Sequence, residues 1–467
     1  MYDYEDEEED IFGTPPAVSS SVPSIDFEKE LNQDQFSAVT APDCPALVLA
    51  GAGSGKTRTL TYRVAYLLSK GVSPEAILLL TFTNKASKQM LSRVEELTGM
   101  ASHRFLGGTF HHVGGQVLRL FGDSISLPRN FTILDDGDSD SLLNEIIRDL
   151  DPDFFKTKEN PKAKPIKGII SFARNIMTDV NQVAKGRYPG NAELLSKIEN
   201  FASLYQKIKL QRGLADYDDL LVYWLEILEN NDEAATYYQN RFSHVLVDEY
   251  QDVNCLQAKI VDKIASKHQI MAVGDDAQCI YTWRGADLDQ ILSFPDRHPG
   301  TKIFKIETNY RSSPEILKLA NDILKSRATE GSFSKELKPS RPHQDLPLVV
   351  PTMDAYQQAD FVLSKVQSLY DSGVHYDDIA ILYRAHFHAM ELQVELSRRG
   401  IPFVITSGMR FFEQAHVKDL VAQLRFVANP KDLTAFFRFA CLLPKVGEKT
   451  AAKVIGIAEK YTLSSQC

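Results

Sequence analysis

The sequence has few cysteines and no long apolar run, and each absence narrows the class of protein. Its five cysteines are an odd number, are widely spaced and form no Cys-x-x-Cys pair, so neither a disulfide framework nor a zinc motif is indicated. No apolar stretch approaches the ~18 residues of a membrane-spanning helix, and the N-terminus is acidic where a secretion signal would be basic. We therefore expect a cytoplasmic globular protein with no membrane partner.

The chain also lacks an excess of positive charge, since its formal net charge is −10 at pH 7. Most of this charge lies in residues 1–30, which hold ten acidic side chains and a single basic one, Lys29. The segment has no hydrophobic periodicity and predicts a disordered acidic tail. Because the remainder is close to neutral, one face can still be basic, and the composition does not exclude a nucleic-acid partner.

What the sequence does contain is a glycine-rich loop between a predicted strand, residues 46–50, and a helical pattern that begins at Lys56-Thr57. In such a loop backbone N–H groups surround phosphate oxygens, while Lys56 reaches the β- and γ-phosphates and Thr57 can bind Mg²⁺. A purely structural glycine turn is the alternative. We expect ATP to be bound by Ala50, Gly51, Ala52, Gly53, Ser54, Gly55, Lys56 and Thr57.

Short apolar strands alternate with helical patterns from residue 31 onward, which is typical of a parallel sheet covered on both faces. The predicted strands are 46–50, 76–82, 243–247, 269–273 and 302–306. Between residues 113 and 214 the strands stop and apolar residues recur at helical spacing, which predicts an inserted helical subdomain.

A second alternation follows residue 311 and predicts another α/β domain without a phosphate loop of its own. Its predicted elements are strands at 346–350, 378–383 and 402–406 and helices at 356–370 and 387–399. Residues 430–467 become helical again.

Polar residues follow two of the strands expected in the first sheet. Asp248 and Glu249 end the strand at 243–247, where Asp248 can hold Mg²⁺ and Glu249 can orient and deprotonate an attacking water. Gln278 follows the strand at 269–273 and could hydrogen-bond a γ-phosphate. Taken alone, a loop glutamine is most often a surface residue.

Tyr281, Trp283 and Arg284 come directly after that glutamine. Aromatic and guanidinium groups close together on a loop are suited to stacking on unpaired bases. The alternative is a small satellite core.

The ordered motifs of this chain resemble those of superfamily 1 helicases of the UvrD/Rep/PcrA type, over roughly residues 31–467. The matching stretches are Gly51-Ala52-Gly53-Ser54-Gly55-Lys56-Thr57, Thr81-Phe82-Thr83-Asn84-Lys85-Ala86, Asp248-Glu249-Tyr250-Gln251-Asp252, Gly274 to Ala286 and Asn309-Tyr310-Arg311-Ser312. The resemblance implies a RecA-like motor domain from 31–112 and 215–310, a helical subdomain at 113–214, an incomplete second RecA-like domain at 311–429 and the start of a helical insertion at 430–467.

The resemblance also implies roles at the nucleotide. Gln35 would hydrogen-bond the adenine, Arg58 and Tyr310 would sandwich it, and Arg311 would be an arginine finger on the γ-phosphate.

For DNA, the resemblance implies that Phe82, Tyr217, Tyr281 and Trp283 stack on bases and that Arg284 contacts a phosphate. Further strand contacts would come from Thr109-Phe110-His111 and from Leu382-Tyr383-Arg384.

Two features depart from the family pattern. Ala277 stands where the family usually has an acid before the glutamine, which removes one expected support for that loop. The chain shows nothing like the last two motifs, one of which carries a second catalytic arginine, so we expect a fragment or a truncated reading frame.

The function expected from this resemblance is an ATP-dependent DNA helicase that moves 3′ to 5′ on single-stranded DNA and unwinds partially duplex DNA. One alternative is a module that binds ATP and single-stranded DNA without unwinding. Another is a phosphate-loop ATPase that is not a nucleic-acid motor.

Overall fold

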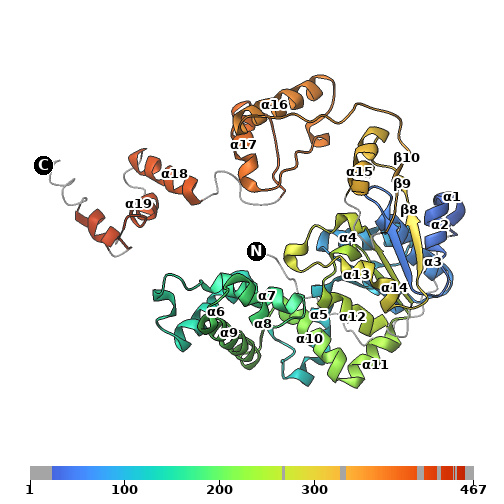
Figure 1. The fold of residues 1–467 in the computed structure, drawn as a ribbon, viewed down its shortest axis with the longest axis horizontal. Coiled ribbons are helices and arrows are strands. Elements are labelled where there is room, and N and C mark those ends of the chain that lie inside the picture. The colour runs from blue at the N-terminus through green and yellow to red at the C-terminus, as the bar shows by residue number, and fades with distance from the viewer. Residues whose placement is uncertain are drawn as a thin grey trace. The chain divides into compact units, whose positions relative to one another are not determined.

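The computed structural model describes residues 24–265, 269–326, 333–406, 415–428, 433–444, 446–447 and 450–457 (Figure 1). The chain divides into two compact units, Met1–Pro347 and Leu348–Cys467. Most of the expected acidic tail, residues 1–23, lies outside the described residues.

A six-stranded parallel sheet with the strand order β3-β2-β6-β7-β1-β8 organises the first unit. Its strands are β1 (Ala46–Ala50), β2 (Ile77–Thr81), β3 (Leu106–Thr109), β6 (His244–Val247), β7 (Gln269–Gly274) and β8 (Lys302–Ile306). All five strands predicted for this sheet are confirmed to within one residue at each end. Strand β3 was not predicted, because a segment with two glycines carries little apolar pattern.

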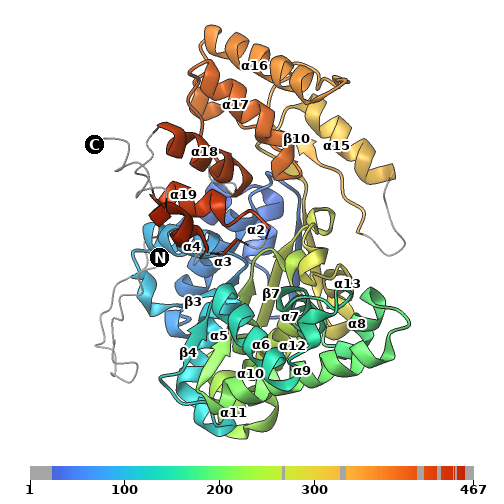
Figure 2. The same ribbon diagram turned by 90° about the vertical axis from the view of Figure 1, so that its left-hand side faces the viewer.

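The sheet is covered by helices on both faces, as its alternating buried side chains require. Leu47 and Leu49 of β1 share a core with α5 (Phe110–Phe121), α10 (Tyr217–Asn230) and α12 (Cys255–Ile264). Val48, which points to the other face, packs with α3 (Lys56–Ser69) and α4 (Asn84–Thr98). The two layers can be followed in Figure 2.

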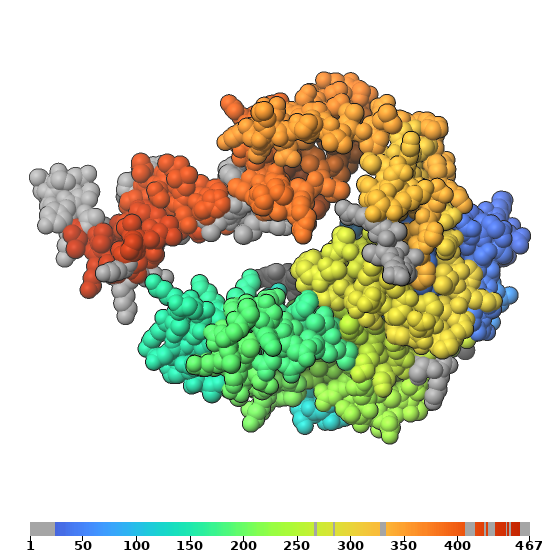
Figure 3. Space-filling view, in the orientation of Figure 1, coloured from blue at the N-terminus to red at the C-terminus, as the bar shows by residue number. Residues whose placement is uncertain are grey.

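The helical insertion has a hydrophobic core of its own, with buried residues that run from Leu134 to Tyr205. It is built from α6 (Asp136–Leu150), α7 (Ala163–Asn175), α8 (Val180–Arg187) and α9 (Ala192–Gln211). The short strands β4 (Thr132–Leu134) and β5 (Leu214–Asp216) pair in parallel at its base. The insertion forms the teal and green lobe of Figure 3.

Smaller elements complete the first unit. They are α1 (Phe27–Glu30), α2 (Gln33–Val39), α11 (Asp232–Arg241), α13 (Asp289–Leu292), α14 (Phe294–Arg297), β9 (Thr308–Asn309), α15 (Pro314–Ser326) and β10 (Lys338–Pro339).

The described part of the second unit includes two helix pairs. Helices α16 (Ala355–Asp371) and α17 (Met390–Arg398) share a small core that includes Leu363 and Leu396. Helices α18 (Ala415–Ala428) and α19 (Leu433–Ala440) form the other pair. The helices expected at 356–370 and 387–399 are therefore present, the latter beginning with a 3₁₀ turn at His386–Ala389.

The three strands predicted for the second unit are wrong for the structure described here. Residues 346–350, 378–383 and 402–406 contain no strand, and no backbone hydrogen bond joins these segments to one another. Their side chains are largely exposed, with Val349 at 92% and Leu382 at 94%. An apolar segment forms a strand only when a neighbouring strand makes hydrogen bonds with its backbone. These segments have no such neighbour in the described part of the second unit.

No helix among the described residues is both long and apolar enough to span a membrane.

Candidate active site

The phosphate loop connects strand β1, which lies between β7 and β8, to helix α3, and two of its glycines need their conformational freedom. Gly53 and Gly55 have φ angles of 75° and 90°, a region that side-chain-bearing residues rarely adopt. Gly55 is also the N-cap of α3. The loop thus directs backbone N–H groups and the positive end of a helix toward one point, as anion binding requires.

Two carboxylates meet this loop from the end of β6, a strand that is separated from β1 by β7. Nζ of Lys56 lies 2.6 Å from Oε2 of Glu249, and Oγ1 of Thr57 lies 3.5 Å from Oδ2 of Asp248. The structure therefore brings together the four residues to which the sequence assigned phosphate, metal and water chemistry.

The Thr57–Asp248 pair has the donor chemistry of a magnesium site, a hydroxyl beside a carboxylate. Burial, together with the neighbouring Glu249 charge, raises the pKa of Asp248 to about 6. A carboxylate in this environment is stabilised by a nearby cation. Among the described residues no group of three or more His, Cys, Asp and Glu side chains is arranged to hold a metal, so remaining ligands would come from phosphate oxygens and water.

Glu249 has an unusual backbone and a partner that the sequence analysis missed. Its φ and ψ of 50° and 47° are left-handed, a strained conformation for a side chain of this size. Nε2 of the buried Gln251 donates to Oε2 of Glu249 at 2.7 Å, and Oε1 of Gln251 accepts from the backbone N–H of Asp275 at 2.9 Å. In the sequence, the sign of this contact was the position of Gln251 within the Asp-Glu-Tyr-Gln-Asp stretch.

Gln278 lies on the loop after β7, where its side chain is held locally. Its Nε2 donates to Oδ2 of Asp275 at 2.5 Å. The support that we expected to be missing at Ala277 is thus supplied by a carboxylate three residues before the glutamine. Because Gln251 bonds both Asp275 and Glu249, the loops after β6 and β7 are directly connected.

A third loop reaches the phosphate loop from β8, the other neighbour of β1. Nδ2 of Asn309 donates to the carbonyl of Ala52 at 2.5 Å, and the backbone N–H of Tyr310 donates to the carbonyl of Gly53 at 2.9 Å. A Cβ added to Gly53 would lie 2.7 Å from Cβ of Arg311. Arg311 therefore emerges directly beside the phosphate loop.

The residues predicted to bind the base lie beside the phosphate loop. Nε2 of the buried Gln35 donates to the carbonyl of Ser54 at 2.9 Å, and Nδ2 of Asn32 donates to the Tyr310 hydroxyl at 2.7 Å. The Arg58 guanidinium lies over the Tyr62 ring, 4.6 Å from its centroid. The expected sandwich between Arg58 and Tyr310 stays a prediction.

Three of the predicted base-stacking residues form one aromatic cluster. The Phe82 and Tyr281 ring centroids are 5.1 Å apart, and those of Tyr281 and Trp283 are 6.3 Å apart. Trp283 is 64% exposed. The cluster combines the residue that follows β2 with the loop that follows Gln278, so the part of the predicted stacking surface on that loop lies within five residues of the predicted γ-phosphate contact.

Tyr217 forms a second aromatic pair, with His111 at a centroid distance of 6.0 Å. A buried charge cluster holds the helix start from which Tyr217 projects. Lys209 is fully buried and pairs with Asp219 at 2.5 Å, and Arg174 pairs with Asp219 at 2.9 Å. Although burial opposes it, the charges of Lys209 and Arg174 keep the pKa of Asp216, the N-cap of α10, below its usual range.

Two further residues, Arg284 and Arg384, were predicted to contact DNA. The side chain of Arg284 lies outside the part of the chain that the structure describes. Arg384 belongs to the second unit and is exposed. Both contacts stay predictions.

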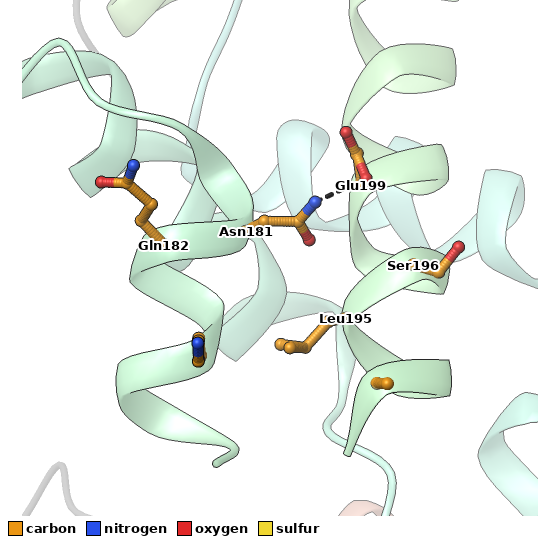
Figure 4. A pocket seen from close by; sticks show the side chains of 7 residues that line it. Asn181, Gln182, Leu195, Ser196 and Glu199 are labelled. Carbon is orange, nitrogen blue, oxygen red and sulfur yellow. Dashed lines mark hydrogen bonds between the residues drawn. The ribbon is translucent and has the colours of Figure 1, made fainter. Parts of the chain in front are cut away.

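An open groove between α8 and α9 lies apart from these residues (Figure 4). Asn181 and Glu199 face each other across it, with Nδ2 of Asn181 donating to Oε2 of Glu199 at 2.5 Å. None of the predicted site residues lines this groove.

The arrangement of a phosphate loop, an Asp-Glu pair and a glutamine loop around a parallel sheet agrees with comparison to known families. Residues 31–299 match the UvrD/REP helicase N-terminal domain, and residues 304–464 match the UvrD-like helicase C-terminal domain. The chain belongs to the UvrD/REP helicase family. The first match contains the phosphate loop, the carboxylates, the aromatic cluster and the insertion.

Individual relatives within this family are called ATP-dependent DNA helicase PcrA. The chain is 36% identical to the protein of Bacillus subtilis, over 93% of this chain and 58% of that protein. It is 35% identical to the protein of Staphylococcus epidermidis, over 86% of this chain and 54% of that protein. It is 34% identical to the protein of Staphylococcus aureus, over 93% of this chain and 59% of that protein. The chain therefore spans less than two thirds of the length of these relatives.

Proposed function

We propose that this chain is an ATP-dependent DNA motor that binds single-stranded DNA, moves along it in the 3′ to 5′ direction and unwinds partially duplex DNA in the cytoplasm. The observation that supports it most is the convergence of Lys56, Thr57, Asp248 and Glu249 at the ends of the parallel strands β1 and β6, which lie on either side of β7. The PcrA proteins to which the chain is similar are named ATP-dependent DNA helicases, which supports the proposal.

In the proposed mechanism the residues of this chain bind and orient the nucleotide. Phosphate-loop N–H groups and Lys56 bind the phosphates, and Glu249 takes a proton from the attacking water. Arg311 stabilises charge on the transferring phosphoryl group. Thr57 and Asp248 would hold Mg²⁺, which neutralises charge on the phosphate oxygens when bound.

Coupling to DNA is proposed to run through the loop after β7. Gln278 responds to the γ-phosphate, and Tyr281 and Trp283 follow it within five residues. A change in the position of Gln278 thus alters the surface on which bases stack.

A second candidate function is a module that binds ATP and single-stranded DNA without unwinding. The observation that favours it is the absence of a sheet from the described residues of the second unit.

Steady-state ATP hydrolysis with and without single-stranded DNA tests both, with Lys56→Ala as the control. Hydrolysis that DNA stimulates and that Lys56→Ala abolishes supports the motor. Binding of nucleotide and DNA with negligible turnover supports the binding module. DNA binding that survives alanine substitution of Tyr281 and Trp283 at full affinity contradicts the proposed DNA surface.

A further inference from the structure

Residues 333–341, which follow α15, pass along the candidate active site and contact two of its loops through the backbone and an apolar side chain. A Cβ added to Gly51 would lie 2.2 Å from Cδ2 of Leu337, so Leu337 covers the phosphate loop. The backbone N–H of Ser340 donates to the carbonyl of Asn309 at 3.0 Å. Nη1 of Arg341 donates to the carbonyl of Arg311 at 2.8 Å.

Lys335 connects the same segment to the loop that carries Gln278. Its ammonium group forms ion pairs with the carboxylates of Asp275 and Asp276. The three side chains are only 6%, 4% and 9% exposed. Lysine is rarely buried to this extent unless it is paired, and the proposed mechanism gives this lysine no part.

Asp275 is the residue through which the charge of Lys335 can act. It accepts from Nε2 of Gln278 at 2.5 Å through Oδ2 and from the backbone N–H of Ala277 at 3.2 Å through Oδ1. Its own N–H donates to Gln251, which bonds Glu249. Asp275 thus stands between the predicted phosphate sensor and the predicted catalytic base.

Two adjacent carboxylates in a buried site repel each other, and a paired cation removes most of that cost. Lys335 is the cation that the structure provides for both. Without it, Asp275 and Asp276 would move apart, and Gln278 and Ala277 would lose a fixed acceptor.

We propose that Lys335 is a positioning residue that holds Asp275, and through it Gln278, in the orientation needed to respond to the γ-phosphate. The proposal rests on the proposed function, because it gives Lys335 a part in nucleotide turnover. Lys335 acts through Asp275 and is not assigned a contact with the nucleotide.

The kinetic test compares Lys335→Met with Lys335→Arg, which keeps the charge. Lys335→Met is expected to lower kcat for DNA-stimulated ATP hydrolysis by about 10- to 100-fold, the range for a residue that orients catalytic groups, with KM for ATP nearly unchanged. Lys335→Arg should retain most of kcat. Lys338→Met is the matched control, because Lys338 lies three residues away in an ion pair with Glu307 but is 66% exposed. An unchanged kcat in Lys335→Met, or an equal loss in Lys335→Met and Lys338→Met, overturns the proposal.

A second readout does not need turnover, so it separates failure of this proposal from failure of the proposed function. The chain has two tryptophans, of which Trp224 is fully buried and Trp283 is 64% exposed. Acrylamide quenching therefore reports mainly on Trp283. We expect a non-hydrolysable ATP analogue to change this quenching in the wild type and not in Lys335→Met, although both bind the analogue. The same change in both proteins overturns the proposal even if the wild type hydrolyses ATP, whereas no change in the wild type overturns the coupling through the loop after β7 on which the proposal rests.

The double variant Asp276→Asn/Lys335→Met keeps the proposal testable if Lys335→Met is too unstable to assay. Removing the second carboxylate relieves the repulsion, so both Tm and kcat should recover in part. If Tm recovers but neither kcat nor the quenching change does, repulsion between Asp275 and Asp276 is not the cause of the lost activity, and the proposal is overturned.

Discussion

Nζ of Lys56 lies 2.6 Å from Oε2 of Glu249, so the cation of the phosphate loop and the carboxylate after β6 form a partly buried ion pair. Both groups are expected to act at the γ-phosphate. A phosphate that binds Lys56 competes with Glu249 for the same ammonium group. Nucleotide binding is thereby linked to release of the proposed catalytic base.

Glu249→Gln tests this relationship, because it removes the charge and keeps the size of the side chain. We expect the affinity for ATP to be retained or increased, since Lys56 loses its anionic competitor. Turnover should fall by about 10²- to 10⁴-fold, as is usual when a general base is removed. A fluorescent ATP analogue measures binding, and kcat measures turnover. Lys56→Ala should lose both, and an equal loss of affinity in Glu249→Gln would contradict the prediction.

Trp283→Ala is expected to weaken binding of single-stranded DNA. Stacking of one base is worth about 1–3 kcal/mol, which corresponds to about a 5- to 150-fold higher Kd. Fluorescence anisotropy with a labelled oligonucleotide gives this value. Ile280→Ala is the matched control, because Ile280 lies on the same loop and is 70% exposed but has no aromatic face. If both variants bind equally weakly, the effect is loss of apolar surface and not stacking.

Lys209→Met is expected to destabilise the first unit. Lys209 is fully buried and pairs with Asp216 and Asp219, so its removal leaves Arg174 as the cation that the described residues provide for both carboxylates. Removing one partner of a buried ion pair typically lowers the free energy of unfolding by about 3–5 kcal/mol. Chemical denaturation measures the loss. Lys207→Met, at an exposed position of the same helix, should change stability by less than about 0.5 kcal/mol.

Asp252→Asn is expected to change how stability depends on pH. Burial, with a contribution from the Glu249 charge, raises the pKa of Asp252 to about 7, and its Oδ1 makes no hydrogen bond with the described residues. A carboxyl whose pKa is higher in the folded chain stabilises the protein at low pH, and this contribution is lost as the pH rises toward 7. The Tm of the variant relative to the wild type should therefore be higher at pH 8 than at pH 5. Differential scanning fluorimetry that shows the same difference at both pH values would refute this assignment.

The parts of the fold that depend on local pattern could be predicted from the sequence. The strand at 46–50, the glycine loop and the helix from Lys56 are contiguous, and their apolar spacing and turn residues suffice. Strand β3 could not be found in this way, because Leu106-Gly107-Gly108-Thr109 is stabilised mainly by pairing with β2.

The contacts that tie the candidate site together were not predictable, because their partners are far apart in the chain. Gln251 meets Asp275 across 24 residues, and Lys335 meets Asp275 across 60. Neither hydrophobic periodicity nor the spacing of motifs predicts a contact between residues so far apart. The opposite error occurred at 378–383, where an apolar pattern predicted a strand but no neighbouring strand is present to pair with it.

The pairing of β1 with β7 and β8 has a consequence for biosynthesis. The phosphate loop is encoded within the first 57 residues, yet its strand is hydrogen-bonded on one side to β7 and on the other to β8, with Ala50 opposite Ile306. The ribosome releases the chain from its N-terminus. More than two hundred residues, including the whole insertion, must therefore follow the loop before β7 and β8 are available to pair with β1. The nucleotide site is therefore one of the first parts of this unit to be made and one of the last to be completed.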